Sequence, residues 1–148
     1  MIRLARQYAA KYSFQANLVV GDVGFLPYEN ASFDHAISVA TYHHLKKEQR
    51  LKAFQELRRV LKPDGTAFVT VWNHWQPGFW FSGHDVMVPW KTKNETLYRY
   101  YHLFSYGEIV KLAKRAGLEV LKAFPESRYR FPVKSFSRNI CLFLKREN

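Results

Sequence analysis

Two apolar runs in the first third of the chain are each followed at once by side chains that could bind a ligand. Asp22 follows Asn17–Gly21 (NLVVG), and the triplet Tyr42–His44 follows His35–Thr41 (HAISVAT). Apolar runs of this length are typical of strands buried in a parallel sheet. Ligands of doubly wound sheets lie beyond the carboxyl ends of the strands. We therefore expect the Asp22 carboxylate and the His43 imidazole at a ligand-binding edge of the sheet.

A second group of candidate residues lies in or next to residues 73–104, a segment with no clean periodicity. A segment this long indicates an inserted functional part rather than an ordinary connection. Arg99 is suited to hold a carboxylate or a phosphate, because its planar guanidinium offers paired N–H donors. The aromatic side chains could stack on an unpaired RNA base, and packing within the segment is the alternative. The candidate substrate contacts here are Trp72, Asn73, Trp90, Arg99, Tyr100, Tyr101 and His102.

The histidines raise the question of a metal site. The six histidines and Asp85 show spacings that match no zinc-binding pattern, and Cys141 is the only cysteine. We therefore expect no metal site. We expect instead that Tyr42 and His43 line the mouth of the substrate site and that His44 begins the next helix. An imidazole that caps this helix is the alternative. With the role given to Arg99, His43 and Arg99 are the candidate catalytic residues.

The periodicity of the whole chain predicts the elements that position these residues. Helices are predicted over 1–12, 48–61 and 105–117. Strands are predicted over 17–21, 35–41, 66–72, 118–124 and 139–145. Ser105 and Glu108 form a capping-box pattern at the start of the last helix, and the turn 62–65 (KPDG) follows the second helix. The order of elements predicts an α/β sandwich with a mainly parallel sheet and a C-terminal antiparallel hairpin at one edge.

The charge distribution points to a polyanionic partner. The chain has 148 residues, a length suited to one domain, and a formal charge of +11. Residues 96–148 hold eleven Lys or Arg against four acidic residues, whereas residues 22–65 hold seven against six. A basic region beside a nearly neutral one is typical of nucleic-acid binding, and surface charge that only improves solubility is the alternative.

Composition also argues against other classes of protein. No apolar run is long enough to span a membrane, and residues 1–12 do not have the pattern of a signal peptide. We therefore expect no membrane partner. Cys141 has no second cysteine with which to form an internal disulfide. The lone thiol is expected to be buried or half-buried in a strand, and it indicates a reducing, cytoplasmic location.

Three linked segments resemble class I S-adenosylmethionine-dependent methyltransferases, which have a Rossmann-like fold. They are LVVGDVGFLPYENASFD (18–34), HAISVATYHHL (35–45) and ELRRVLKPDGTAFVTVW (56–72). The resemblance implies S-adenosylmethionine as the cofactor, with the Asp22 carboxylate accepting a hydrogen bond from the adenine amino group. It implies that the Val23 backbone N–H serves the adenine ring and that Ala40 lies near the sulfonium. Residues 1–148 then form a partial methyltransferase domain with an inserted aromatic substrate segment at about 73–104.

A narrower resemblance covers WNHWQPGFWFSGHDVMVPWK (72–91) and LYRYYHLFSYGEIVKLAKRAGLEV (97–120). These segments resemble the methyltransferases that esterify the 5-carboxymethyl group of the wobble uridine in tRNA. The resemblance implies tRNA as substrate and a small zinc-containing activator subunit as a further partner. A carboxylate is already nucleophilic, so the reaction needs in-line placement of the groups rather than a strong base.

The chain departs from the superfamily pattern at its amino-terminal end. None of its seven glycines forms the Gly-x-Gly loop that holds the methionine end of the cofactor, and no second strand offers an acidic ribose ligand. The helix 1–12 matches the one that follows this second strand, so we expect the strand 17–21 to lack an inner neighbour. An internal start codon, a natural remnant and a second polypeptide that supplies the lost part are the three explanations.

Three functions follow from these observations. The first is methyl transfer to the wobble uridine of tRNA, with the expectation that this chain is inactive alone because it lacks the glycine-rich loop. The second is a non-catalytic RNA-binding remnant of the same family. The third is methyl transfer to a small molecule, against which the basic residues 96–148 argue.

Overall fold

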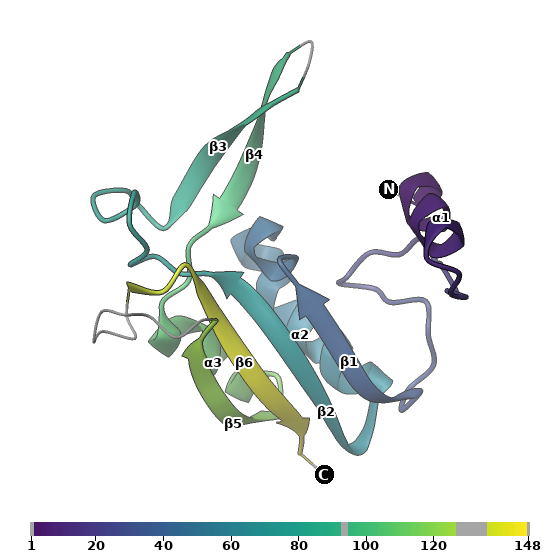
Figure 1. The fold of residues 1–148 in the computed structure, drawn as a ribbon. Helices are drawn as coiled ribbons and strands as arrows, with labels where there is room; N and C mark the ends of the chain where they lie inside the picture. Colours follow the sequence, from purple (N-terminus) through teal and green to yellow (C-terminus); the bar gives the residue numbers. More distant parts are fainter. Residues whose placement is uncertain (1, 93–94, 127–135, 148) are drawn as a thin grey trace.

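A four-stranded sheet with helices on one face forms the body of the computed structural model, which describes residues 2–92, 95–126 and 136–147 (Figure 1). The strands lie in the order β1 (Phe33–Val39), β2 (Leu61–Trp72), β6 (Asn139–Arg146) and β5 (Leu118–Pro125). β1 is parallel to β2, and β6 is antiparallel to both β2 and β5. Three strands therefore run in one direction. The prediction of an α/β fold with a C-terminal antiparallel hairpin is confirmed, and β6 lies inside the sheet with β5 at its edge.

Two helices cover the sheet and close its main core. α2 (Lys47–Val60) and α3 (Tyr106–Arg115) agree with the predicted helices to within a few residues. The Ser105 side chain accepts a hydrogen bond from the Glu108 backbone N–H (3.2 Å), as the capping pattern predicts. The fully buried residues of this core include Phe54, Leu61, Val69, Val71, Phe104, Ile109, Leu118, Ile140, Leu142 and Leu144. Cys141 is buried in β6, as expected.

The predicted turn after α2 is accommodated within a strand. β2 already begins at Leu61, and its pairing with β1 shifts register between Phe33 and His35. Phe33 lies opposite Leu61 and His35 opposite Thr66, so β2 bulges outward over the predicted turn. Asp64 in this bulge has a φ of 61°. The turn chemistry was therefore predicted correctly, but the start of the strand was not.

The predicted strand at residues 17–21 is wrong. These residues have no regular structure, and Val19 and Val20 are 52% and 81% exposed. A strand requires a partner for its backbone N–H and C=O groups, and none of the described strands lies beside this segment. The outer edge of β1 is likewise unpaired among the described residues, and its Ile37 is 76% exposed.

The inserted segment contains a hairpin that its sequence did not reveal. β3 (Asp85–Lys91) and β4 (Thr96–His102) pair only with each other and project from the body (Figure 1). Both faces of this ribbon are partly exposed, so it lacks the alternation of apolar and polar residues that marks a half-buried strand.

The amino-terminal helix α1 (Ile2–Lys11) has the predicted bounds but buries none of its residues. It lies apart from the sheet and is joined to β1 by an irregular segment (Figure 1). None of the helices among the described residues is long and apolar enough to cross a membrane.

Gly117 generates a test of how α3 and β5 are joined. Its φ is +77°, and an added Cβ would lie 2.7 Å from the Arg58 Nε. Gly117→Ala should lower the free energy of unfolding by about 1–2 kcal/mol, because a non-glycine residue is strained in this region. Urea unfolding checks this value. Gly107→Ala is the matched control, because its Cβ would meet no atom within 4 Å and it lies in α3. Equal stabilities of the two variants would contradict the prediction.

Candidate functional site

A strained turn at the carboxyl end of β1 begins the candidate site. Ala40 has a φ of 57°, a conformation that few non-glycine residues adopt. Its backbone N–H points to Thr70, with the carbonyl oxygen at 3.3 Å and Oγ1 at 3.2 Å. The turn directs the following 3-10 helix η1 (Tyr42–His44) toward the end of β2. Strain of this kind is concentrated at functional sites in proteins.

Three aromatic rings from three elements meet at this end of the sheet, and we call His43, Trp72 and Tyr101 the aromatic cluster. Tyr101 of β4 stacks on Trp72 of β2 with ring centroids 4.3 Å apart, and on His43 of η1 at 5.0 Å. His44 packs edge-on against Tyr101, and Phe79 packs against Trp72. The structure therefore brings together three of the residues that the sequence singled out.

His43 is a neutral imidazole in this setting. The side chain is 1% exposed, and burial together with the neighbouring His44 lowers its pKa to about 3. Its Nδ1 accepts a hydrogen bond from the Trp72 backbone N–H (3.3 Å). This bond assigns the proton to Nε2, so His43 offers a neutral N–H donor at neutral pH.

Two predicted substrate contacts are structural residues instead. Tyr42 is 2% exposed, its hydroxyl donates to the Ala53 carbonyl oxygen (3.2 Å), and its ring packs on Phe54. Burial raises the pKa of the Tyr42 hydroxyl well above its ordinary value. Asn73 is fully buried and donates from Nδ2 to the Ser137 carbonyl oxygen (2.8 Å). The prediction that Tyr42 lines the substrate mouth is therefore wrong, and so is the role given to Asn73.

Tyr100 and His102 lie on the opposite face of β4 from Tyr101, because side chains alternate along a strand. The Tyr100 hydroxyl donates to Asp85 Oδ1 (2.6 Å) and accepts from Arg50 Nη2 (2.8 Å). His102 Nδ1 contacts the same Asp85 oxygen at 2.7 Å. Both residues thus belong to an ionic network at the base of the hairpin, which corrects their predicted place in the substrate site.

The network continues from His102 to the two covering helices. His102 Nε2 contacts Glu108 Oε1 of α3 at 2.8 Å, and Arg50 of α2 lies 3.2 Å from Asp85 and 3.6 Å from Glu108. Both ring nitrogens of His102 thus lie within hydrogen-bonding distance of a carboxylate oxygen. We call Arg50, Asp85, Tyr100, His102 and Glu108 the ionic network.

Charges within the ionic network keep both of its carboxylates ionised. Burial would raise the pKa of Glu108, but the hydrogen bond and charge of His102, with Arg50 and His84, hold that pKa below its ordinary value. The Tyr100 hydrogen bond is the largest cause that lowers the pKa of Asp85, and His102 and Arg50 add to it. The ion pairs of a partly buried network are screened less than those at the surface.

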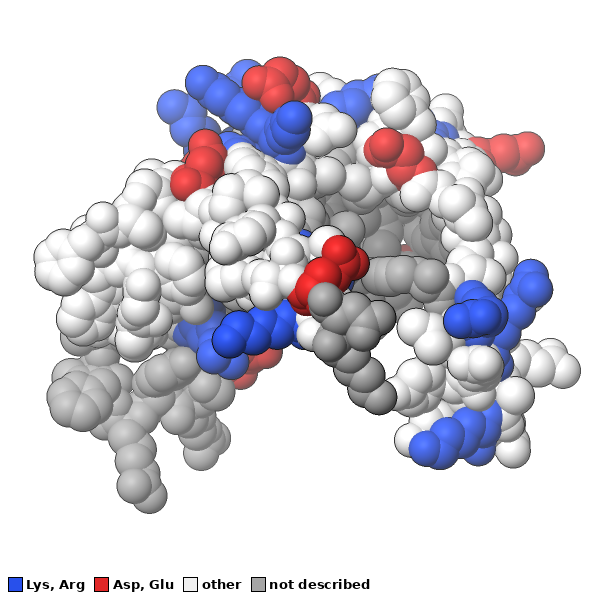
Figure 2. Space-filling view, turned by 90° about the horizontal axis from the view of Figure 1, so that it is seen from above, with Lys and Arg blue, Asp and Glu red and all other residues white. Residues whose placement is uncertain are grey.

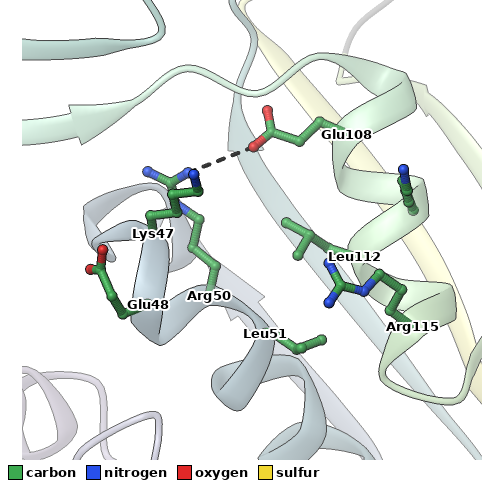
Figure 3. Close-up of a pocket in the computed structure, with 8 residues that line it drawn as sticks. Lys47, Glu48, Arg50, Leu51, Glu108, Leu112 and Arg115 are labelled. Atoms are coloured by element: carbon green, nitrogen blue, oxygen red, sulfur yellow. Dashed lines mark ion pairs between the residues drawn. The ribbon is translucent and has the colours of Figure 1, made fainter.

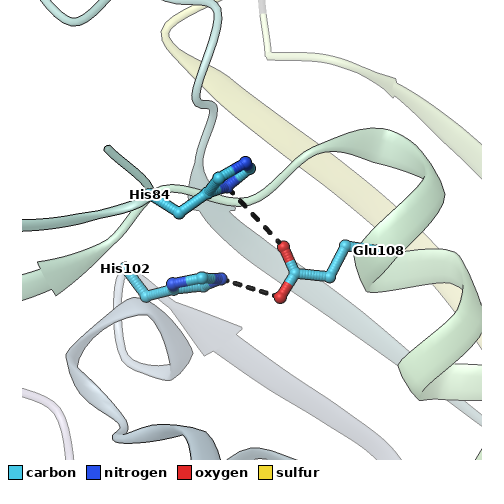
Figure 4. Close-up of side chains that lie close together, drawn as sticks. All are labelled: His84, His102 and Glu108. Atoms are coloured by element: carbon cyan, nitrogen blue, oxygen red, sulfur yellow. Dashed lines mark hydrogen bonds and ion pairs between the residues drawn. The ribbon is translucent and has the colours of Figure 1, made fainter. Parts of the chain in front are cut away.

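His84 extends this network into a group that the sequence did not suggest. The ligand atoms of His84, His102 and Glu108 lie within 4.8 Å of one another (Figure 4). Hydrogen bonds already engage them, since His84 Nδ1 contacts the Leu103 carbonyl oxygen at 2.7 Å and His102 contacts Glu108. No spacing pattern could have found this group, because its members come from separate elements. The expectation that the chain binds no metal stays a prediction.

Arg99 and Trp90 lie further out on the hairpin. The Arg99 guanidinium carbon is 4.4 Å from the Trp90 ring centroid, a cation–π contact, and both side chains are exposed. Arg99 lies on the same face of β4 as Tyr101, two residues away. The structure therefore places Arg99 on the path from the aromatic cluster to the hairpin tip rather than beside His43.

Asp22 and Val23 form an exposed hydrogen-bonding edge on the irregular segment before β1. Asp22 Oδ1 accepts from the Gly24 N–H (2.7 Å), while the second carboxylate oxygen and the Val23 N–H have no partner among the described residues. An acceptor beside a donor matches the amino group and ring nitrogen of adenine. These two residues fit the adenine role predicted for them, although no strand precedes them.

Comparisons with known proteins place this geometry in a wider context. Residues 1–65 match the family model described as "Methyltransferase domain". The chain is 34% identical over 131 residues to the tRNA (carboxymethyluridine(34)-5-O)-methyltransferase of Schizosaccharomyces pombe, covering 71% of this chain and 58% of that protein. It is 48% identical over 56 residues to the Arabidopsis thaliana protein of the same name, covering 37% of this chain and 14% of that one.

A similar fold is found in an S-adenosylmethionine-dependent methyltransferase from Clostridium acetobutylicum. The two structures align with a TM-score of 0.78 at 12% identity, covering 99% of this chain and 71% of the other. The chain thus spans less than two thirds of the Schizosaccharomyces pombe relative, while nearly all of it aligns with the known fold.

The ionic network generates a prediction about acid stability. The folded-state pKa values of Asp85 and Glu108 are lowered, so their contribution is present above the unfolded values near about pH 4 and is lost as pH falls through the folded values. Glu108→Gln should lower the free energy of unfolding by about 1–3 kcal/mol at neutral pH. This difference should shrink as the pH falls from 5 toward 3. Urea unfolding over this pH range is the measurement.

Glu119→Gln removes the same charge from an exposed position on β5 and is the control. Its acid profile should match that of the wild type. A constant difference between Glu108→Gln and the wild type over the whole pH range would show that the network does not titrate with folding.

Proposed function

We propose that this chain is part of an S-adenosylmethionine-dependent methyltransferase that methylates the carboxylate of a 5-carboxymethyl group on the wobble uridine of tRNA. The relatives named for this reaction support the proposal, as does the aromatic cluster at the carboxyl ends of β1 and β2. The cluster carries the proposal, because its Trp72 is partly exposed where this fold places its substrate and could stack on an unpaired base, while the buried rings of His43 and Tyr101 hold it in place.

The residues present fit the adenine end of the cofactor. The free oxygen of Asp22 would accept from the adenine amino group, and the Val23 N–H would donate to the adjacent ring nitrogen. Ala40 holds the turn that places η1 beside the site. When bound, S-adenosylmethionine supplies an electrophilic methyl group, and the substrate oxygen forms a C–O bond as the C–S bond breaks. Residues for the methionine and ribose ends are not assigned in the described part of the chain.

Neutral His43 suits a substrate that is itself the nucleophile. A carboxylate needs no base to attack a sulfonium methyl group, but protonation would remove its nucleophilicity. With its pKa lowered to about 3, His43 can donate a hydrogen bond from Nε2 without transferring a proton at neutral pH. Its stacking on Tyr101 fixes the orientation of the imidazole. Because His43 is 1% exposed, it is assigned as a positioning residue that holds Tyr101 and Trp72 beside the substrate without adding a base to the site.

The partly exposed ring of Trp72 supplies the stacking surface, the buried Tyr101 supports it, and the hairpin extends the site. Arg99 follows Tyr101 on one face of β4 and is positioned by Trp90, so its guanidinium can meet a phosphate or the substrate carboxylate. tRNA is the partner in this proposal. The zinc-containing activator subunit and the cytoplasmic location implied by the sequence belong to the same proposal.

The reaction is tested with a tRNA transcript that carries 5-carboxymethyluridine at the wobble position and with S-adenosylmethionine labelled on its methyl group. Methyl ester formation should make the label releasable as methanol by mild alkali, whereas methylation at carbon or nitrogen would not. Label that resists alkali would refute esterification. Binding of tRNA without cofactor heat in calorimetry, and without label transfer, would support the non-catalytic RNA-binding alternative instead.

Tyr101→Leu tests the stacking surface. It should lower kcat/KM for tRNA about tenfold to a hundredfold, because stacking on one base contributes about 1–3 kcal/mol. Affinity for S-adenosylmethionine should not change. Tyr98→Leu is the matched control, since Tyr98 lies on the same strand, is 65% exposed and is on the other face.

In the same assays, Asp22→Ala should abolish cofactor binding, and unchanged binding would remove Asp22 from the adenine site.

A further inference from the structure

A groove of about 590 Å³ runs between the two helices that cover the sheet. Figure 3 shows its lining: Arg50 and Leu51 come from α2, and Glu108, Leu112 and Arg115 come from α3. We call it the α2–α3 groove. Its upper end in this view is closed by Arg50 and Glu108, the two members of the ionic network that face each other across it.

Free positive charge dominates the α2–α3 groove. Arg50 and Glu108 neutralise each other, but the side chains of Lys47, Lys111 and Arg115 have no ion-pair or hydrogen-bond partner among the described residues. All three are exposed. Glu48 is the remaining acidic residue of the lining. Unpaired cations on both walls of a groove attract an extended anion more strongly than the same charges scattered over a convex surface.

The positive charge continues beyond the groove along the same helices. A second hollow of about 460 Å³ shares Arg115 and is lined by Lys52, Arg58 and Arg59, with Glu56 as its one acidic residue. The two hollows together are lined by seven Lys or Arg and three Glu. Figure 2 shows Lys and Arg gathered at upper left, on the side where α2 and α3 lie behind the sheet. Basic side chains that line two adjoining hollows match several phosphates rather than one ion.

The closed end of the groove, at Arg50 and Glu108, lies at the end of the sheet that also holds the aromatic cluster. α2 begins after η1 and α3 begins after β4, so both helix N-termini lie at the end of the sheet where His43 and Tyr101 meet. The partial positive charge of the two N-termini adds to that of Lys47 and Lys111. The ionic network joins the two sites directly, because Arg50 at the groove contacts Tyr100, the neighbour of Tyr101.

We propose that the α2–α3 groove binds the phosphodiester backbone of RNA next to the nucleotide that stacks on the aromatic cluster. The inference rests on the proposed function, since it assumes that the cluster holds a base of tRNA. Lys47, Lys111 and Arg115 contact the phosphates. The phosphates position the RNA and carry no sequence information, and the base is read at the cluster.

The test measures binding of a fluorescent tRNA transcript by anisotropy over a series of salt concentrations. The double variant Lys111→Gln and Arg115→Gln should lower the slope of log K against log salt by about two, because each lost phosphate contact removes about one released counterion. The control is the double variant Lys11→Gln and Lys122→Gln, which removes the same charge from α1 and β5. It should keep the wild-type slope. Circular dichroism verifies that all variants are folded.

Each outcome decides between the groove, the proposed function and another partner. Equal slopes for the groove and control variants, with tight binding by the wild type, would overturn the groove while leaving the proposed function intact. No tRNA binding by the wild type would refute both. Poly-glutamate bound as tightly as tRNA, and lost in the same groove variant, would show that the groove takes acidic proteins and would overturn the RNA assignment.

Discussion

The described structure depends on one strand, β2, which is hydrogen-bonded along both edges. Its parallel pairing with β1 and antiparallel pairing with β6 satisfy its backbone groups, while Val69 and Val71 are fully buried in the core with α2 and α3. A strand held in this way can shift neither its register nor its face. Trp72 at its carboxyl end is therefore fixed, and the Trp72 N–H in turn fixes the His43 ring. The sheet therefore sets the positions of Trp72 and His43 in the aromatic cluster.

The hairpin contacts this rigid body through two sets of side chains, because successive side chains of β4 lie on opposite faces of the strand. Tyr101 turns toward the cluster, whereas Tyr100 and His102 turn toward Asp85, Arg50 and Glu108. A partly buried ionic network is costly to desolvate, and it holds only while each charge keeps its partner. The network thus fixes the base of the hairpin to both covering helices. The same strand consequently links the aromatic cluster with the α2–α3 groove.

Among the described residues, helices cover the sheet on one side only. α2 and α3 lie over one face, while Ile37 and Val39 of β1 and Phe143 of β6 are 76%, 62% and 41% exposed. The basic residues Arg128, Arg130 and Lys134, which contribute to the predicted polyanion-binding region, lie outside the described residues. The basic side chains that line the two hollows along α2 and α3 therefore lie on the covered side of the sheet. The sequence did not single out α2, because residues 22–65 are nearly neutral in sum.

The sequence by itself determined the α/β class and the order of the main elements, because buried strands and amphipathic helices carry strong local periodicity. The capping residue Ser105 and the turn before Thr66 were equally local and were read correctly. His43 and Trp72 could be singled out because each follows or ends such an element, whereas the resemblance pointed to Asp22 and Val23, and the aromatic composition of residues 73–104 pointed to Tyr101.

Only the tertiary structure decided which of these residues meet. Tyrosine and asparagine are residue types that a binding site would use, but packing buries both Tyr42 and Asn73. No sequence pattern distinguishes a buried tyrosine from an exposed one. The prediction of a strand at 17–21 failed because a strand requires a neighbouring strand with which to pair. The apolar character of a segment does not show whether such a neighbour is present. The ionic network and the α2–α3 groove bring together residues far apart in the chain. Both features depend on the distances between elements, which the spacing of residues along the sequence does not give.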